Sequence, residues 1–194
     1  MSLDELINAF ELSRVQKGSA VFDETKLFSV NQHWMRKLSD EDFISKGNFP
    51  TNDLEKLRKA VPLLKERART FDEARDMLSG ELSCLFEEPK LDQNQLIAKE
   101  PNGCPGMTKS ALEGLLEPIK ALSEGASAEV VKNATMPFAD TEETKIKGGR
   151  GAVLWPLRYA LSGKERSPDP FTLLSILGKE ESISRIQKAI AILN

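Results

Sequence analysis

The chain has 194 residues, of which 40% are hydrophobic and 29% charged, and its formal net charge at pH 7 is -3. This composition excludes a disordered or fibrous protein and suits one ordinary globular domain or two small ones. No apolar run approaches the roughly 18 residues of a membrane span, and no secretory signal pattern is present. We therefore expect a cytoplasmic protein that does not associate with membranes.

The spacing of apolar residues predicts an all-α fold. Leucine occurs 25 times, against 17 for valine and isoleucine together, and the apolar positions recur at helical rather than alternating spacing. A capping box at Ser2 predicts a first helix. The next apolar stripe advances by three or four residues and predicts a second helix. Its members are Leu27, Val30, Trp34 and Leu38.

Two further helices are predicted before residue 90. One begins near Asp53 and contains Pro62, which we expect to kink it. The next has Thr70 as its N-cap and Gly80 as its end. The helical pattern weakens near Pro89, and this change predicts a domain boundary between residues 1–90 and residues 91–194.

The second half opens with a predicted loop over residues 99–107, which holds two prolines and two glycines. Thr108 then caps a helix that ends at Gly125, and Ser127 caps the following one. A helix from about Val153 to Leu161 is predicted to stop at Gly163. Two more follow, one from Phe171 to Leu177 and an amphipathic one carrying Ile183, Ile186, Ile190 and Leu193.

The sequence is poor in side chains for catalysis or metal binding. His33 is its one histidine, and Cys84 and Cys104 lack the paired spacing of a zinc or redox motif. No Gly-x-x-x-x-Gly-Lys-Ser/Thr phosphate loop is present, and the glycines of residues 148–151 lack the dinucleotide spacing. We therefore predict no catalytic residue, no metal site and no cofactor site in this chain.

Charge is unevenly distributed along the chain. Residues 145–166 carry six basic side chains and one acid, a local charge of +5, so the rest of the chain sums to -8. Seven acids fall within residues 72–92. This segregation predicts one basic face on an acidic protein, and such a face attracts nucleic acid.

The most informative segment follows Gly163. Pro168 and Pro170 restrict the turn, and Pro170 suits the first position of a helix. Phe171, with Arg158 and Arg166 nearby in sequence, offers an aromatic ring and guanidinium groups, as proteins that read single-stranded RNA do, and places them at a helix N-terminus suited to phosphate. A Pro-stopped interhelical turn with Phe171 in the core is the structural alternative.

Three blocks of sequence carry a family resemblance. The first runs from Phe10 to Lys17 and continues through Ala20-Val21-Phe22-Asp23, Lys26-Leu27, Asn31 and Trp34-Met35-Arg36. The second comprises Leu64 to Thr70 and Leu85-Phe86. The third comprises Trp155 to Gly163, Ser167-Pro168, Phe171, Leu177-Gly178-Lys179-Glu180 and Arg185-Ile186. Together these blocks resemble the C-terminal, anticodon-binding region of bacterial-type glutamyl-tRNA synthetase, a class I synthetase.

The resemblance implies a helical cage in residues 1–90 and a terminal helical bundle in residues 91–194. It also implies that the catalytic core, with its ATP and Mg, belongs to the parent glutamate-tRNA ligase and is absent from this chain. Gly106 to Ser110 is similar to the class I signature Lys-Met-Ser-Lys-Ser, but its position in the family order argues against that role. We predict an ordinary loop there.

The resemblance also implies individual roles in binding the anticodon loop of tRNA-Glu. Arg158 matches the arginine that contacts the first anticodon base, with Ser167 and Pro168 at the adjacent turn. Phe171 matches an aromatic residue beside the second base. Arg67 matches a position associated with the third base and with exclusion of glutamine tRNA.

The sequence departs from the family pattern at three positions. Asp169 and Pro170 stand where a glycine and an aliphatic residue are common, and Ser29 stands where tryptophan is frequent. We expect a monomer whose partners are tRNA-Glu and the catalytic domain of the same polypeptide. The alternative hypothesis is a helical protein-interaction module with no RNA role, and a self-contained enzyme is a third.

Overall fold

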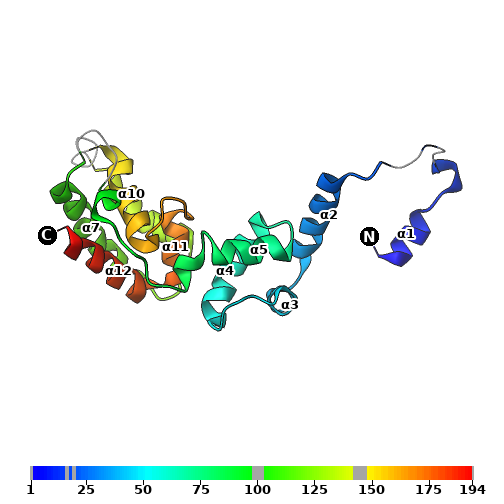
Figure 1. The fold of residues 1–194 in the computed structure, drawn as a ribbon, viewed down its shortest axis with the longest axis horizontal. Helices are drawn as coiled ribbons and strands as arrows, with labels where there is room; N and C mark the ends of the chain where they lie inside the picture. Colours follow the sequence, from blue (N-terminus) through cyan, green and yellow to red (C-terminus); the bar gives the residue numbers. More distant parts are fainter. Residues whose placement is uncertain (1, 16–17, 19–20, 98–102, 142–147, 194) are drawn as a thin grey trace.

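The computed structural model describes residues 2–15, 18, 21–97, 103–141 and 148–193, and these residues form helices and no strand. The all-α prediction is therefore confirmed. Figure 1 shows an extended arrangement, with α1 at one end, α2 to α5 in the middle, and the helices of the second half gathered at the other end. Among the helices that the structure describes, none is long and apolar enough to cross a bilayer.

Four helices make up the middle of the molecule. Each has a Ser, Thr or Asp cap whose side chain accepts a hydrogen bond from an amide in the first turn, as predicted for Thr70. Phe43, Leu57 and Leu64 are fully buried where these helices meet. The helices are α2 (Glu24–Lys37), α3 (Asp40–Gly47), α4 (Leu54–Arg67) and α5 (Phe71–Ser79).

The N-terminal segment stands apart from this group. It comprises α1 (Leu3–Ala9), which begins at the predicted Ser2 capping box, and the 3-10 helix η1 (Leu12–Arg14). The predicted stripe on α2 forms on a helix, but it does not face the core: Leu27, Val30 and Trp34 are about half exposed. The periodicity predicted the helix correctly but not its buried side, because the side chain that α2 buries is Met35.

The second half is a bundle in which α7, α8, α10, α11 and α12 pack against one another. Leu112, Leu115, Leu157 and Leu173 lie in its core. The 3-10 helix η2 (Ser83–Leu85) lies in the segment that leads from α5 into the bundle. The helices of the bundle are α6 (Gln93–Leu96), α7 (Pro105–Lys120), α8 (Ala128–Ala139), α10 (Gly149–Ser162), α11 (Pro170–Leu177) and α12 (Lys179–Ile192).

Two predicted helix starts are wrong. The helix predicted to follow Thr108 begins at Pro105 instead, because proline suits the first helical position and its missing amide costs nothing there. Thr108 is buried inside α7, so Gly106 to Ser110 is helical and not a loop. Likewise α10 begins at Gly149 instead of near Val153. The earlier part of the predicted loop, residues 99–102, lies outside the described residues.

A buried arginine joins the elements where the two halves meet. Arg185 on α12 is only 4% exposed. Its Nη1 atom donates to the carbonyl oxygens of Cys84 at 2.7 Å and Leu161 at 2.5 Å, and Nη2 donates to that of Glu87 at 3.1 Å and to the Glu181 carboxylate at 2.5 Å. Residues 84–87 and the end of α10 are thus fixed to α12. The boundary near residue 90 stays a prediction.

Replacing this arginine should destabilise the fold strongly. Arg185→Met keeps most of the side-chain volume but leaves buried carbonyl oxygens without donors, so the free energy of unfolding should fall by about 3 kcal/mol. Urea denaturation followed by circular dichroism measures the change. Lys188→Met on the same helix is the control, because its exposed ion pair with Glu88 contributes under about 1 kcal/mol. Equal losses in both variants would contradict the assignment.

The two cysteines should differ in reactivity. Cys84 is buried, and burial raises the pKa of its thiol, which keeps it in the unreactive neutral form, whereas Cys104 is exposed. With a thiol-specific chromogenic reagent at pH 8, we expect one thiol to react in the native protein and the second only after unfolding in urea. Cys104→Ser should abolish the native reaction. Fast modification of Cys84 in that variant would contradict the prediction.

Candidate nucleic-acid interface

The predicted site begins where α10 ends. Gly163 adopts a left-handed conformation, with φ of 64°, and terminates the helix as predicted. Arg158, one turn earlier, donates from Nη2 to the Glu165 carbonyl at 3.0 Å and from Nη1 to the Ser167 carbonyl at 3.4 Å. Its guanidinium also lies 4.8 Å from the centroid of the Trp155 ring. Arg158 therefore holds the following turn, residues 163–168, against the end of α10.

The turn leads directly into α11, where Pro170 occupies the predicted first position. The structure explains the unusual Asp169: its carboxylate accepts hydrogen bonds from the Phe171 amide at 3.1 Å and the Thr172 amide at 3.0 Å. These are the amides that a phosphate would use at a helix N-terminus. A phosphate would have to displace a carboxylate of like charge, so the phosphate contact predicted at this helix end is not supported.

The other predicted residues of the turn differ in exposure. Pro168 is buried, Ser167 is half-buried, and the Ser167 hydroxyl donates to the Pro168 carbonyl at 3.3 Å. Phe171 is half-buried and packs against the core with one part of its ring surface. Arg158, Ser167, Pro168 and Phe171 are thus brought together on one turn, with Pro168 contributing mainly to packing.

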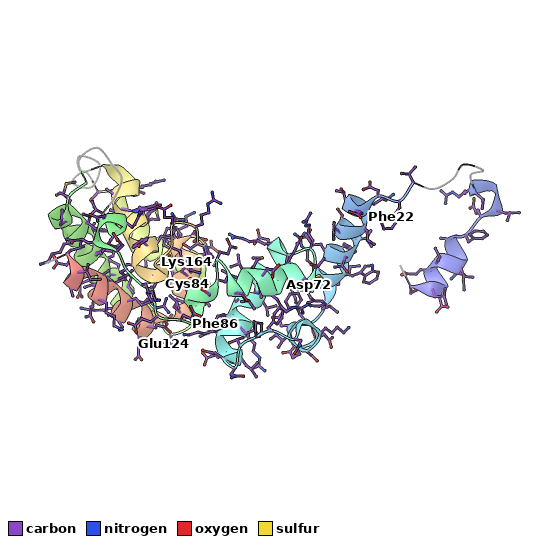
Figure 2. All side chains as sticks on the ribbon, viewed as in Figure 1. Phe22, Asp72, Cys84, Phe86, Glu124 and Lys164 are labelled. Atoms are coloured by element: carbon purple, nitrogen blue, oxygen red, sulfur yellow. The ribbon has the colours of Figure 1, made fainter. Side chains whose placement is uncertain are left out.

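Lys164 ties this turn to the middle of the molecule. Its Nζ atom donates to the Ser83 hydroxyl at 2.7 Å and to the Gly80 carbonyl. Figure 2 shows Lys164 beside Cys84 at the junction of the two halves. Sequence reasoning counted Lys164 only as part of the basic segment, because a contact between residues 81 positions apart leaves no local signal.

Arg67 contacts the same segment, residues 80–83. It lies in the last turn of α4, and its Nη1 atom pairs with the Glu81 carboxylate at 3.1 Å while 42% of its side chain stays exposed. Residues 80–83 are therefore contacted both by Arg67 and by Lys164 of the turn that Arg158 holds. The two predicted arginines are thus linked to one segment, Arg67 directly and Arg158 through the turn that carries Lys164.

The described basic residues of segment 145–166 are spread along α10 and the turn that follows it. Arg150 lies at the start of α10 and pairs with Asp140, while Arg158 and Lys164 lie toward its other end, so the charges spread over about 20 Å along the helix. Lys145 and Lys147 lie outside the described residues. What remains near the candidate site is a small cationic group at the turn, with Arg166 exposed.

The acidic run is largely a set of paired carboxylates. Hydrogen bonds from Arg69 lower the pKa of Glu73, and the hydrogen bond from Lys188 lowers that of Glu88. Glu81 pairs with Arg67. These carboxylates serve as ion-pair partners, and among the described residues no group of three His, Cys, Asp or Glu gathers as metal ligands would.

Comparison with known proteins identifies the family. A family model described as an anticodon binding domain matches residues 27–190, so the chain belongs to this family. It is 32% identical over 199 residues to a glutamate-tRNA ligase of Flavobacterium johnsoniae, with 99% of this chain covered, and 30% identical over 198 residues to one from an Anaeromyxobacter species. It spans 37% and 39% of their lengths, respectively.

Solved structures agree with this assignment. The glutamate tRNA ligase of Elizabethkingia meningosepticum, crystallised with its amino acid, superposes with a TM-score of 0.67 at 32% identity. The match covers 100% of this chain and 37% of that one. The helical fold and the resemblance inferred from sequence are therefore both confirmed, whereas the individual site residues stay predictions.

The role of Arg158 in holding the turn can be tested directly. Arg158→Lys keeps the positive charge but loses the guanidinium group, whose two terminal nitrogens donate to the Glu165 and Ser167 carbonyls. Amide hydrogens in residues 163–167 should then exchange roughly tenfold faster, since each lost bond to a charged donor is worth about 1–2 kcal/mol. Hydrogen–deuterium exchange with peptide-level mass spectrometry measures this. Unchanged exchange at the turn, with normal global stability, would refute the holding role.

Proposed function

We propose that this chain binds the anticodon loop of tRNA-Glu. The observation that carries the proposal is the arrangement around residues 80–83: Arg67 pairs with Glu81, and Lys164 anchors the Arg158 turn to Gly80 and Ser83. Two arginines held by contacts to the same short segment suit a splayed single strand, whose bases present their edges and faces. The anticodon-binding family supports the same function.

The roles of the residues follow the resemblance and fit their surroundings. Arg158 contacts the first anticodon base, with Ser167 and Pro168 shaping the turn; its two carbonyl contacts use two of the five N–H donors of a guanidinium. Phe171, half-exposed, stacks beside the second base. Arg67 reads the third base and helps to exclude glutamine tRNA.

The protein to which this chain belongs is, in our proposal, a glutamate-tRNA ligase that attaches glutamate to tRNA-Glu with ATP and Mg. The names of its relatives support this activity. The catalytic domain lies elsewhere in the same polypeptide, and this chain contributes tRNA recognition alone. The protein is a cytoplasmic monomer. The comparisons match anticodon-binding ligases and give no support to a protein-interaction module without an RNA role.

Binding of tRNA-Glu and of the same tRNA with its first anticodon base changed tests the proposal. The chain should prefer the natural anticodon, and Arg158→Ala should reduce that preference by about 1–3 kcal/mol, roughly 5- to 150-fold in the ratio of dissociation constants. Gel-shift titration at fixed salt measures the ratio, because phosphate contacts make affinity salt-dependent.

Arg150→Ala is the matched control. It removes an arginine from the same helix, but that arginine pairs with Asp140 away from the turn, so the preference should be unchanged. Equal binding of both tRNAs by the unaltered chain, or no binding at all, would reject anticodon recognition and favour the interaction-module hypothesis.

A further inference from the structure

Arg67 stands at a helix end that another helix holds in place. The last carbonyl groups of any α-helix have no partner within the helix. In α4 the amide of Ala68 bonds to the Leu64 carbonyl at 2.8 Å, and the carbonyls of Lys65 and Glu66 come next. These two groups precede Arg67 directly, so whatever binds them also fixes the backbone from which the Arg67 side chain projects.

Side chains of α2 supply the missing donors. Arg36 donates from Nε to the Lys65 carbonyl at 3.1 Å and from Nη2 to the Glu66 carbonyl at 2.7 Å. Gln32 donates to the same Glu66 carbonyl at 3.1 Å. The fork of one guanidinium therefore spans two successive carbonyls, and its positive charge lies at the negative end of the α4 dipole.

A third side chain of α2 completes the contact beyond Arg67. Asn31 donates from Nδ2 to the Arg69 carbonyl at 2.6 Å. The three donors thus fix carbonyls at positions 65, 66 and 69, on both sides of Arg67. In contrast, the opposite, apolar side of α2, with Leu27 and Trp34, is about half exposed and does not reach α4 through these bonds.

We propose that Arg36, supported by Gln32 and Asn31, is a positioning residue for third-base recognition. By holding the C-terminal turn of α4, it keeps the Arg67 guanidinium where it pairs with Glu81 and faces the anticodon loop. The inference rests on the proposed function, and it assigns to α2 a part in specificity without contact to RNA.

The test compares two RNA hairpins that carry the anticodon stem and loop of tRNA-Glu. One has the natural third anticodon base, cytosine, and the other has guanine, which glutamine tRNA carries at that position. Fluorescence anisotropy at fixed salt gives, for the whole chain, the dissociation constant of the guanine hairpin divided by that of the cytosine hairpin. A high ratio means strong preference for the natural third base. Arg67→Ala should lower this ratio by about tenfold, and Arg36→Ala should lower it by at least about fivefold.

Matched variants separate positioning from charge. Arg36→Lys keeps the positive charge but cannot span two carbonyls, so its ratio should resemble that of Arg36→Ala. Lys37→Ala removes a neighbouring cation whose ammonium lies over the Trp34 ring of its own helix, and it should leave the ratio unchanged. Gln32→Glu places a carboxylate against the Glu66 carbonyl and should lower the ratio in the same direction as Arg36→Ala. Circular dichroism confirms that each variant folds.

The possible outcomes are distinct. If Arg36→Ala weakens both hairpins equally and reduces the salt dependence, or if Arg36→Lys restores the ratio, Arg36 acts by its charge and the inference is wrong. If Arg67→Ala lowers the ratio but Arg36→Ala and Gln32→Glu do not, the inference fails while the proposed function stands. If the unaltered chain binds both hairpins and a scrambled loop equally, the proposed function fails as well.

Discussion

The buried guanidinium of Arg185 constrains the junction on which the candidate interface is built. A charge taken out of water must be matched by hydrogen bonds, and here they come from the Cys84, Leu161 and Glu87 carbonyls and the Glu181 carboxylate. These partners belong to η2, to the last turn of α10, to the segment after η2, and to α12 itself. Because Leu161 lies two residues before Gly163, the same contact that joins the halves also fixes where the Arg158 turn begins.

Apart from Arg67, which pairs with the Glu81 carboxylate, several cationic side chains in this region bind backbone carbonyl oxygens. Arg158 does so within its own turn, Lys164 across to Gly80, and Arg36 across to the end of α4. A carbonyl is a neutral acceptor, so these contacts orient a cation without cancelling its charge, whereas the ion pairs of Glu73 and Glu88 do cancel. This difference explains how a chain with a net charge of -3 keeps positive side chains at the one junction where RNA is proposed to bind.

Local sequence patterns predicted the helices, but they did not predict contacts between residues far apart in the chain. The caps at Ser2, Thr70 and Ser127 were predicted because a cap is decided within four residues. The prediction that Thr108 caps a helix was wrong, because a threonine also fits inside a helix, and here a proline three residues earlier begins it. The stripe of Leu27, Val30 and Trp34 predicted a helix but not what that side of the helix would contact.

The candidate site residues were predicted from motifs, but the side chains that hold them in place were not. Lys164 and Arg36 form hydrogen bonds with residues 81 and 29 positions away in the chain, so no local pattern indicates these contacts.

The Asp169 cap makes phosphate binding at the turn unfavourable. With the Phe171 and Thr172 amides occupied by a carboxylate, the N-terminus of α11 is a poor site for a phosphate group. Under the proposed function, recognition there depends on the remaining N–H donors of Arg158 and on the exposed part of the Phe171 ring, which can stack on a base. Phosphate contacts give affinity without sequence information, whereas base contacts discriminate. An acidic residue at this position therefore weakens general attraction for RNA at the turn while leaving the groups that distinguish one anticodon from another.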